Sequence, residues 1–351
     1  MAALSNAYLD TKIPTKIVSP IKINGIYANG EFSVPIATYE TTLWPSTQRG
    51  ARVTCVAGGI NVSVLKDVMT RSVLLEASNT CSAVSIILSL EQKFGDMQEV
   101  TRSTSSICTL EKFSSRIVGN LIFLRFEFNT GDASGHNMST KAANALIRWI
   151  LEKYHDLTYV SISGNYCVDK KNSAVNSILG RGKYVIADIS ISNDQCKKYL
   201  RSTPEKIAAL NVKKNLIGSI IAGGVCSANA HFANILLGIY LSTGQDAANI
   251  VEGSQGITHA EVQNENLYFS VTLPNIIVGV VGNGKDLPFA KQNLELMGCS
   301  IGSKDGSSAK KLASIIAATV LCSELSLLAA QTNQGELTKS HMYYERQNRN
   351  V

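Results

Sequence analysis

Residues 125–163 read RFEFNTGDASGHNMSTKAANALIRWILEKYHDLTYVSIS, and this stretch decides the fold of the middle of the chain. The apolar run that ends near residue 129 and the alternating run at 157–163 each predict a strand. Between them Ala142, Leu146, Ile150 and Tyr154 recur every four residues, which gives a helix over 138–155 one apolar face. A strand, a helix and a second strand in succession predict a βαβ-type unit.

Around this unit we expect a small domain at 72–161 that interrupts a larger domain made of 1–71 and 162–351. Upstream of the unit, a helical pattern at 82–94 leads through a Ser/Thr-rich segment to strands within 115–129. The larger domain is predicted from four patterns: strands and turns over 17–65, closely packed helices in the Gly/Ala-rich section 218–250, strands over 257–282, and an amphipathic helix over 307–330.

Composition excludes several classes of protein. The 351 residues are 45% apolar and 17% charged with a net charge of +6, and their scattered Lys and Arg form no nucleic-acid-binding stripe. Eight Cys lie far apart without zinc spacing, which predicts reduced thiols and no metal site. The N-terminus has no apolar signal-peptide core, and the apolar runs at 215–225 and 312–323 are shorter than the roughly 20 residues that span a bilayer. We expect a soluble, cytoplasmic protein.

The loop SGNYCVDKK (Ser163–Lys171) follows the strand at 157–163 and carries one carboxylate and two ammonium groups. Asp169, Lys170 and Lys171 at a strand end suit an anionic ligand or a carbonyl oxygen on which negative charge develops. From the loop alone, a solvated charged turn is the alternative interpretation.

Two glycine turns suit a phosphate group. GDASGHN (Gly131–Asn137) follows a strand and opens a helix, whose N-terminus offers free N–H groups and a positive dipole end. It lacks the G-x-G-x-x-G spacing, and a plain turn capped by Asn137 or Ser139 is the alternative. The turn VVGNGKD (280–286) is open to the same two interpretations.

Three more residues are candidates for acid–base chemistry. Glu40 lies in PIATYETT, where apolar neighbours would raise the pKa of its carboxyl as a general acid requires. Asp246 precedes a helical segment, and His341 lies in a polar stretch after the last helix. The plainer interpretations are a strand-rim residue, an N-cap and an exposed histidine, respectively.

Taken together, these segments resemble one family, the hydroxymethylglutaryl-CoA (HMG-CoA) reductases in their class I form. The likeness runs in order from about residue 34 to 346. It is carried by seven segments: VPIATYETTLWPSTQRG, RFEFNTGDASGHNMSTKA, SISGNYCVDKKNSA, KKNLIGSIIAGG, ANAHFANI, YLSTGQDAAN, and ELSLLAA followed by LTKSHM.

The resemblance implies a two-step reduction of HMG-CoA to mevalonate and CoA by NADPH, in the mevalonate pathway of isoprenoid biosynthesis. By the same likeness Lys170 stabilises the carbonyl oxyanion and Asp246 holds that lysine. Glu40 is the proton donor, and His341 protonates the departing CoA thiolate.

The resemblance also implies binding residues and an architecture. The substrate residues are Arg71, Ser163, Asp169, Lys171, Lys214, His231 and Asn234. The cofactor residues are Asp132, Ala133, Gly135, Asn137, Gly282, Asn283 and Gly284. The implied fold is α+β, a large α/β substrate-binding domain with an inserted ferredoxin-like cofactor-binding domain, and the implied assembly is a homodimer or higher homo-oligomer with the site at the subunit interface.

The chain departs from the family pattern at four places. The N-terminal dimer motif is replaced by KIPTKIVSP (12–20), and Ser105-Ser106-Ile107 lacks the arginine expected near the 2′-phosphate of NADPH, so NADH is not excluded. His136 stands where the family has methionine, and Tyr39 where it has threonine. The pair Trp44-Pro45 lies near the predicted site and could reshape the substrate pocket. The alternatives to an HMG-CoA reductase are a paralogue that reduces another acyl-CoA and a non-catalytic CoA- or nucleotide-binding homologue.

Overall fold

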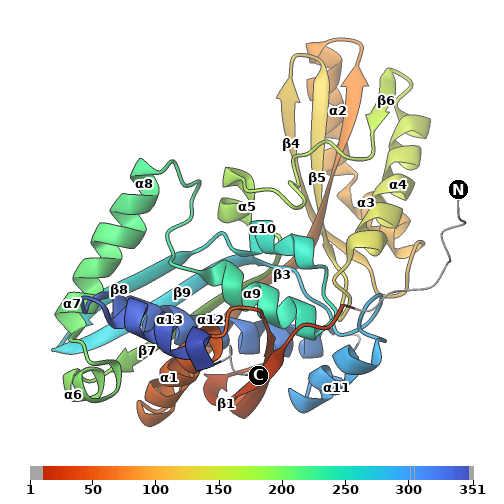
Figure 1. Ribbon diagram of the computed structural model, residues 1–351. Coiled ribbons are helices and arrows are strands. Elements are labelled where there is room, and N and C mark those ends of the chain that lie inside the picture. The colour runs from red at the N-terminus through yellow and green to blue at the C-terminus, as the bar shows by residue number, and fades with distance from the viewer. Residues whose placement is uncertain (1–10, 301, 304, 348–351) are drawn as a thin grey trace, which may run out of the picture.

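One mixed sheet forms the frame of the computed structural model, which describes residues 11–300, 302, 303 and 305–347. Its strand order is β2-β1-β3-β7-β9-β8 (Figure 1). The β1–β3 pair is parallel and the other neighbours are antiparallel. The strands are β1 (Thr15–Gly25), β2 (Asn29–Ala37), β3 (Ile60–Ala77), β7 (Gly182–Ile191), β8 (Ile257–Gln263) and β9 (Asn266–Ile276).

The 18-residue strand β3 continues out of this sheet into a second one, where the order is β6-β3-β5-β4 and every pair is antiparallel. The added strands are β4 (Thr109–Val118), β5 (Leu121–Asn129) and β6 (Leu157–Ser161). With the helices α2 (Thr80–Gln92), α3 (Phe94–Arg102) and α4 (His136–Lys153), this is the β-α-β-β-α-β order of a ferredoxin-like unit. It projects from the main body (Figure 1) and has its own apolar cluster of residues between 73 and 157. The fold is α+β, as predicted.

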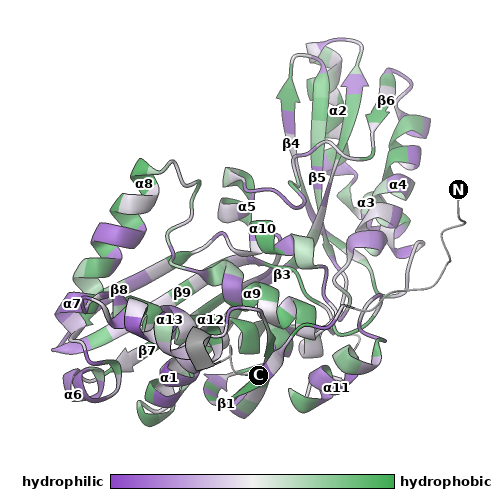
Figure 2. Ribbon diagram, viewed as in Figure 1, coloured by the Kyte–Doolittle hydropathy of each residue, from purple (hydrophilic) through white to green (hydrophobic). Residues whose placement is uncertain are grey.

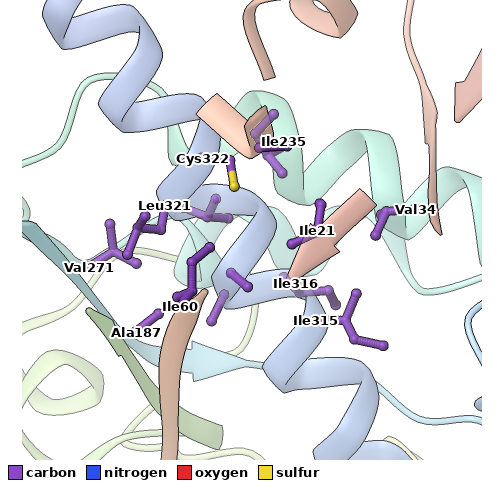
Figure 3. Close-up of a cluster of buried hydrophobic side chains, with 14 of the residues drawn as sticks. Ile21, Val34, Ile60, Ala187, Ile235, Val271, Ile315, Ile316, Leu321 and Cys322 are labelled. Atoms are coloured by element: carbon purple, nitrogen blue, oxygen red, sulfur yellow. The ribbon is translucent and has the colours of Figure 1, made fainter. Parts of the chain in front are cut away.

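Helix α12 (Ser307–Gln331) runs through the main apolar core (Figure 3). Among the described residues it is the one helix long and apolar enough to cross a membrane, but 94% of its apolar window is buried inside the protein. It is therefore packed as a core helix. The expected amphipathic pattern at 307–330 was wrong, because side chains on every side of α12 contact the sheet or other helices.

The strand-and-turn prediction for 17–65 missed a helix, α1 (Leu43–Val56). Pro45 lies in its first turn, where a missing N–H costs no helical hydrogen bond. Gly50 packs directly against the backbone carbonyl of Cys322 on α12, so that any larger side chain would clash. Trp44 is buried, and its indole N–H donates to the Ile36 carbonyl at 2.8 Å.

The remaining helical segments surround the main sheet or extend from it. They are α5 (Ala174–Leu179), α6 (Asn193–Gln195), η1 (Cys196–Leu200), α7 (Pro204–Leu210), η2 (Asn211–Gly218), α8 (Ser219–Ile221), α9 (Phe232–Ser242), η3 (Ala247–Asn249), α10 (Ile250–Gly253), α11 (Pro288–Leu296) and α13 (Glu336–Gln347). The helical run α7–η2–α8 extends away from the body, and Ile220 and Ile221 at its end are 73% and 82% exposed (Figure 2). The predicted helical packing over 218–250 holds for α9 but not for the irregular segment 222–231.

Candidate active site

The predicted loop at Ser163–Lys171 is a loop in the structure, and it delivers Lys170 to Asp246. The Lys170 Nζ lies 2.8 Å from Asp246 Oδ2, with about 40% of each side chain exposed to solvent. Lys170 has a φ of 55° and Val168 a φ of 42°, so the chain adopts a left-handed conformation that non-glycine residues rarely take. Asp246 also caps η3 by accepting the N–H of Ala248 at 3.2 Å, so its N-cap interpretation and its pairing with Lys170 both apply.

Electrostatics favours the ionised form of this pair. The hydrogen bond that Lys170 donates to Asp246 raises the pKa of Lys170 against the opposing effect of burial. Burial alone raises the pKa of Asp246, but the hydrogen bond and the charge of Lys170 outweigh it, and the pKa of Asp246 falls. Lys170 is therefore a fixed, partly exposed cation at neutral pH.

Beneath the pair lies a buried ionic network that the sequence did not reveal. Arg181 Nη1 lies 2.9 Å from Asp169 Oδ1 and 2.8 Å from Glu252 Oε1. The side chain of Arg181 is 2% exposed and that of Glu252 is fully buried. Asn249 donates from Nδ2 to Glu252 Oε1 at 2.9 Å. Burial raises the pKa of Glu252, opposed by backbone N–H groups and by Arg181.

The two predicted glycine turns and the segment before Asp246 meet beside this pair. Residues 133 and 281 form a parallel bridge, and Gly279 packs on the backbone of residues 132–134. Gly244 and Gly284 are in backbone contact, so a Cβ on either would clash. Helix α4 begins after Gly135, which has a φ of 92°, and no side chain caps its first N–H groups. Neither Asn137 nor Ser139 is the cap. These free N–H groups and the glycine backbone fit a phosphate-bearing cofactor.

Asp132 and Lys285 lie within the same cluster. Asp132 is buried, and its two oxygens accept hydrogen bonds from Ala309 N in the first turn of α12, at 2.7 Å, and from Ser303, which precedes that helix. Its role in cofactor binding stays a prediction, because these partners already satisfy the carboxylate. Lys285 is 6% exposed, and burial lowers its pKa against the charges of Asp246 and Asp286. In the sequence, nothing marks Lys285 beyond its place after the GNG turn.

Glu40 and His341 line a separate cleft of about 1330 Å³, together with His231 and Asn234. Glu40 Oε2 accepts from Asn234 Nδ2 at 3.0 Å, and Oε1 accepts from Thr42 at 3.3 Å. The apolar environment expected for Glu40 was wrong, because it follows β2 at the protein surface and is exposed. Lys170 and Asp246 do not line this cleft in the single chain. Pro45 does, whereas the buried Trp44 does not.

The cleft is basic over much of its wall. Arg49 Nη1 on α1 lies 2.7 Å from Glu336 Oε1 on α13, and this ion pair links the two helices at the cleft. Five cationic side chains line the cleft: Arg49, Arg52, Lys198, Arg201 and Lys339.

Glu324 on α12 supports one wall of this cleft from inside. Its fully buried carboxylate accepts the backbone N–H of His231 at 2.6 Å and of Ala230 at 3.0 Å, and the hydroxyl of Thr258 at 3.0 Å. Burial lowers the pKa of Lys214, and the charge of Glu324 opposes this shift. Lys214 lies in η2, a π-helical stretch of a kind frequent at functional sites.

The other predicted substrate residues lie around the Lys170 loop. Arg71 on β3 donates from Nε to the Ile162 carbonyl at 3.2 Å, next to Ser163. Lys171 Nζ donates to the Asp169 carbonyl at 3.1 Å and is exposed. In the described part of the chain, no three His, Cys, Asp or Glu side chains gather as a metal site would require, and all eight Cys are free.

Comparison with known proteins gives the family. The family model described as "Hydroxymethylglutaryl-coenzyme A reductase" matches residues 6–346. The chain is 44% identical over 332 residues to 3-hydroxy-3-methylglutaryl-coenzyme A reductase of Aeropyrum pernix, covering 94% of this chain and 78% of that protein. The chain belongs to the hydroxymethylglutaryl-coenzyme A reductase family.

Other members of the family are similar over comparable lengths. The reductase of Pyrococcus horikoshii is 45% identical over 91% of this chain and 78% of its own length, and reductase 3 of Solanum tuberosum is 39% identical over 97% and 59%. Among solved structures, the class II reductase of Streptococcus pneumoniae bound to NADPH superposes with a TM-score of 0.75. It is 21% identical and covers 94% of this chain and 87% of its own, which confirms the fold.

His136, at the start of α4, faces the charged groups of the site. Its Nε2 lies 4.0 Å from Asp169 Oδ1. Burial lowers the pKa of His136, and the charges of Arg181 and Lys170 lower it further. The charges of Asp169 and Asp246 raise this pKa but do not outweigh the lowering effects. The folded state therefore favours the neutral imidazole.

We predict that His136 destabilises the fold in acid. Its folded pKa lies below the unfolded value of about 6.5, so the stability it contributes is present above about pH 6.5 and is lost as the pH falls through the folded pKa. Thermal melts at about pH 7.5 and about pH 5 should show a smaller loss for His136→Met than for the natural chain. His155→Met, at an exposed histidine after the same helix, is the matched control. Equal losses in the natural chain and in His136→Met would contradict the prediction.

Proposed function

We propose that this chain is an HMG-CoA reductase, which reduces HMG-CoA to mevalonate and CoA with two equivalents of NADPH. The observation that carries the proposal is the Lys170–Asp246 ion pair, set beside the glycine turns in a member of this family. A cation held at a carbonyl oxygen stabilises the charge that develops there in both reductions.

The chain's own residues divide the remaining chemistry. NADPH, when bound, supplies the hydride. Asp246 keeps Lys170 protonated and in place, and Glu40 gives a proton to the reduced carbonyl oxygen. His341 protonates the CoA thiolate as it leaves, a task suited to an imidazole near neutral pH.

The proposed binding surfaces follow the charges. Lys171, Lys214, Arg71, Ser163 and Asp169 hold the hydroxymethylglutaryl group, whose free carboxylate needs a cation. His231 and Asn234 form the wall of the substrate site beside Glu40. The basic cleft suits the phosphates of CoA, because it lies next to Glu40 and carries five cations.

The cofactor is proposed to lie along Asp132–Asn137 and the turn Gly282–Gly284, with its phosphates at the N-terminus of α4. Lys141 on α4 donates to the Thr104 carbonyl at 2.9 Å, which places a cation beside Ser105–Ile107. Arg116 on β4, a second candidate to replace the missing arginine, donates to the hydroxyl of Tyr166 at 3.2 Å. Lys141 therefore supports a preference for NADPH despite the missing arginine.

We further propose a cytoplasmic homodimer or higher oligomer whose site is shared between subunits. The separation of the Glu40–His341 cleft from the Lys170–Asp246 pair supports a shared site. Exposed apolar side chains on α5, which follows the Lys170 loop, and on the projecting η2–α8 run and the segment after it support a covering partner. They are Ile178, Ile217, Ile220, Ile221 and Val225.

The proposed cofactor-binding domain is 72–161, and the proposed substrate-binding domain is 1–71 together with 162–351. Residues 1–10 and 348–351 of the latter lie outside the described structure.

Initial rates with HMG-CoA, measured with NADPH and NADH side by side, test the function. We expect oxidation of NADPH that depends on HMG-CoA, with the product mevalonate formed at half the rate of cofactor loss, and slower oxidation of NADH. A panel of other acyl-CoA thioesters serves as the control. Faster turnover of another thioester would assign a paralogue, and CoA binding without hydride transfer would assign a non-catalytic homologue.

A further inference from the structure

A single buried oxygen holds the backbone of the Lys170 loop. Oε1 of Glu252, on α10, accepts the Lys170 backbone N–H at 3.1 Å, Arg181 Nη1 at 2.8 Å and Asn249 Nδ2 at 2.9 Å. The Glu252 side chain is fully buried. Hydrogen bonds to an ionised acceptor are stronger than those to a neutral one. Glu252 is thus a strong anchor for a loop that is otherwise partly exposed.

The same anchor reaches the neighbouring residue through Arg181. Arg181 Nη1 lies between Glu252 Oε1 and Asp169 Oδ1, at 2.8 and 2.9 Å. Asn249 makes a second, longer link to Asp169, at 3.4 Å. Two consecutive loop residues, Asp169 and Lys170, are therefore tied to one buried group.

The conformation of Lys170 needs such an anchor. Its φ of 55° is unfavourable for a residue with a side chain, and such conformations persist where surrounding contacts impose them. This conformation directs the ammonium group to Asp246. Without the acceptor on its N–H, the loop loses the contact that fixes the backbone at that residue.

We propose that Glu252 is the positioning residue for Lys170. It makes no hydrogen bond to the ammonium group or to any reacting atom, although its charge adds to the raised pKa of Lys170, and it acts by holding the backbone from which Lys170 extends. The catalytic consequence rests on the proposed function, whereas the placement of Lys170 is a property of the fold. The second oxygen of Glu252, Oε2, has no hydrogen-bond partner in the structure, which makes a buried carboxylate costly at this position. The need to hold the Lys170 backbone explains why a carboxylate stands there.

Glu252→Ala and Glu252→Gln test the proposal by kinetics. We expect Glu252→Ala to lower kcat by roughly 10- to 100-fold, because a small displacement of a catalytic group costs about that much, while the KM for NADPH changes less than about twofold. Glu252→Gln should lose less, since its amide oxygen still accepts the Lys170 N–H. Tyr240→Phe is the matched control. Tyr240 on α9 is fully buried, and its hydroxyl lies next to Gly253, which follows Glu252 in α10.

The reactivity of Lys170 toward an amine-acylating reagent, followed by mass spectrometry, gives a readout independent of turnover. In Glu252→Ala the ammonium should leave Asp246, its pKa should fall, and labelling of Lys170 should accelerate, while Lys171 serves as the reference within the loop. Unchanged labelling together with unchanged kcat, or a loss of activity that only follows loss of folded protein, would overturn the proposal. If Glu252→Ala fails to fold, Glu252→Gln decides: its uncharged, weaker acceptor should still raise the labelling of Lys170 relative to Lys171, and an unchanged ratio would overturn the proposal. Absence of turnover in the natural chain would reject the proposed function, and the labelling would still decide the role of Glu252.

Discussion

Lys170→Ala should remove nearly all HMG-CoA-dependent oxidation of NADPH. The ammonium group of Lys170 is the one cation paired with Asp246 among the described residues, and the electrostatics of the pair keep it charged. Removing a preorganised donor from a carbonyl oxyanion costs on the order of 100- to 1000-fold in kcat, and here the donor carries a full charge. Initial rates under saturating HMG-CoA and NADPH, followed by NADPH absorbance, measure the loss.

The fold should survive this change, because about 40% of the Lys170 side chain is exposed and its backbone contact to Glu252 remains. Lys153→Ala removes an exposed lysine at the C-terminal end of α4, opposite to the helix start that faces the site, and is the matched control. Mixing Lys170→Ala with Glu40→Gln subunits also tests the shared site, since a hybrid oligomer then contains one intact site. Full activity of Lys170→Ala would reject the assignment of Lys170, and a mixture without recovered activity would reject a site shared in this way.

The parts of the fold that could be predicted are those whose signal is local. The period of Ala142, Leu146 and Ile150 gave α4 within two residues at each end, and the alternating run gave β6. The Lys170 loop was recognised because its charges are adjacent in sequence. Helix α1 was missed because Gly50 within it suggested a turn, whereas this glycine lets α1 approach α12.

The parts of the site that could not be predicted depend on contacts between distant segments. Glu252 lies 82 residues from Lys170 along the chain, and in the sequence it resembles an ordinary helix residue. Arg181 reads as the start of a strand, although its side chain links Asp169 to Glu252. Neither residue type nor spacing signals such a network. A buried charge is identified as functional only when burial and partners are known.

Glu324 illustrates the same difficulty with a larger effect on stability. In the sequence it only interrupts an apolar run, but in the structure it is a fully buried carboxylate in the middle of the core helix. Its oxygens accept from two successive backbone N–H groups, of Ala230 and His231, and from the Thr258 hydroxyl. Glu324→Ala leaves all three donors without their acceptor, and we expect it to lower the free energy of unfolding by about 3–5 kcal/mol.

Chemical denaturation of Glu324→Ala, Glu324→Gln and Glu261→Ala measures this effect. Gln keeps an acceptor oxygen of nearly the same shape, so it should recover part of the loss, whereas Glu261, about half exposed on β8, should contribute little.

The Glu324 variants also separate the effect of charge from the effect of side-chain shape at the cleft. If Glu324 only supports the wall, Glu324→Gln should bind HMG-CoA nearly as well as the natural chain. If its charge also holds Lys214 protonated against burial, Glu324→Gln should raise the KM for HMG-CoA at alkaline pH first, because the pKa of Lys214 falls further when that charge is removed. A Glu324→Ala protein as stable as the natural chain would contradict the role assigned to this carboxylate in the core.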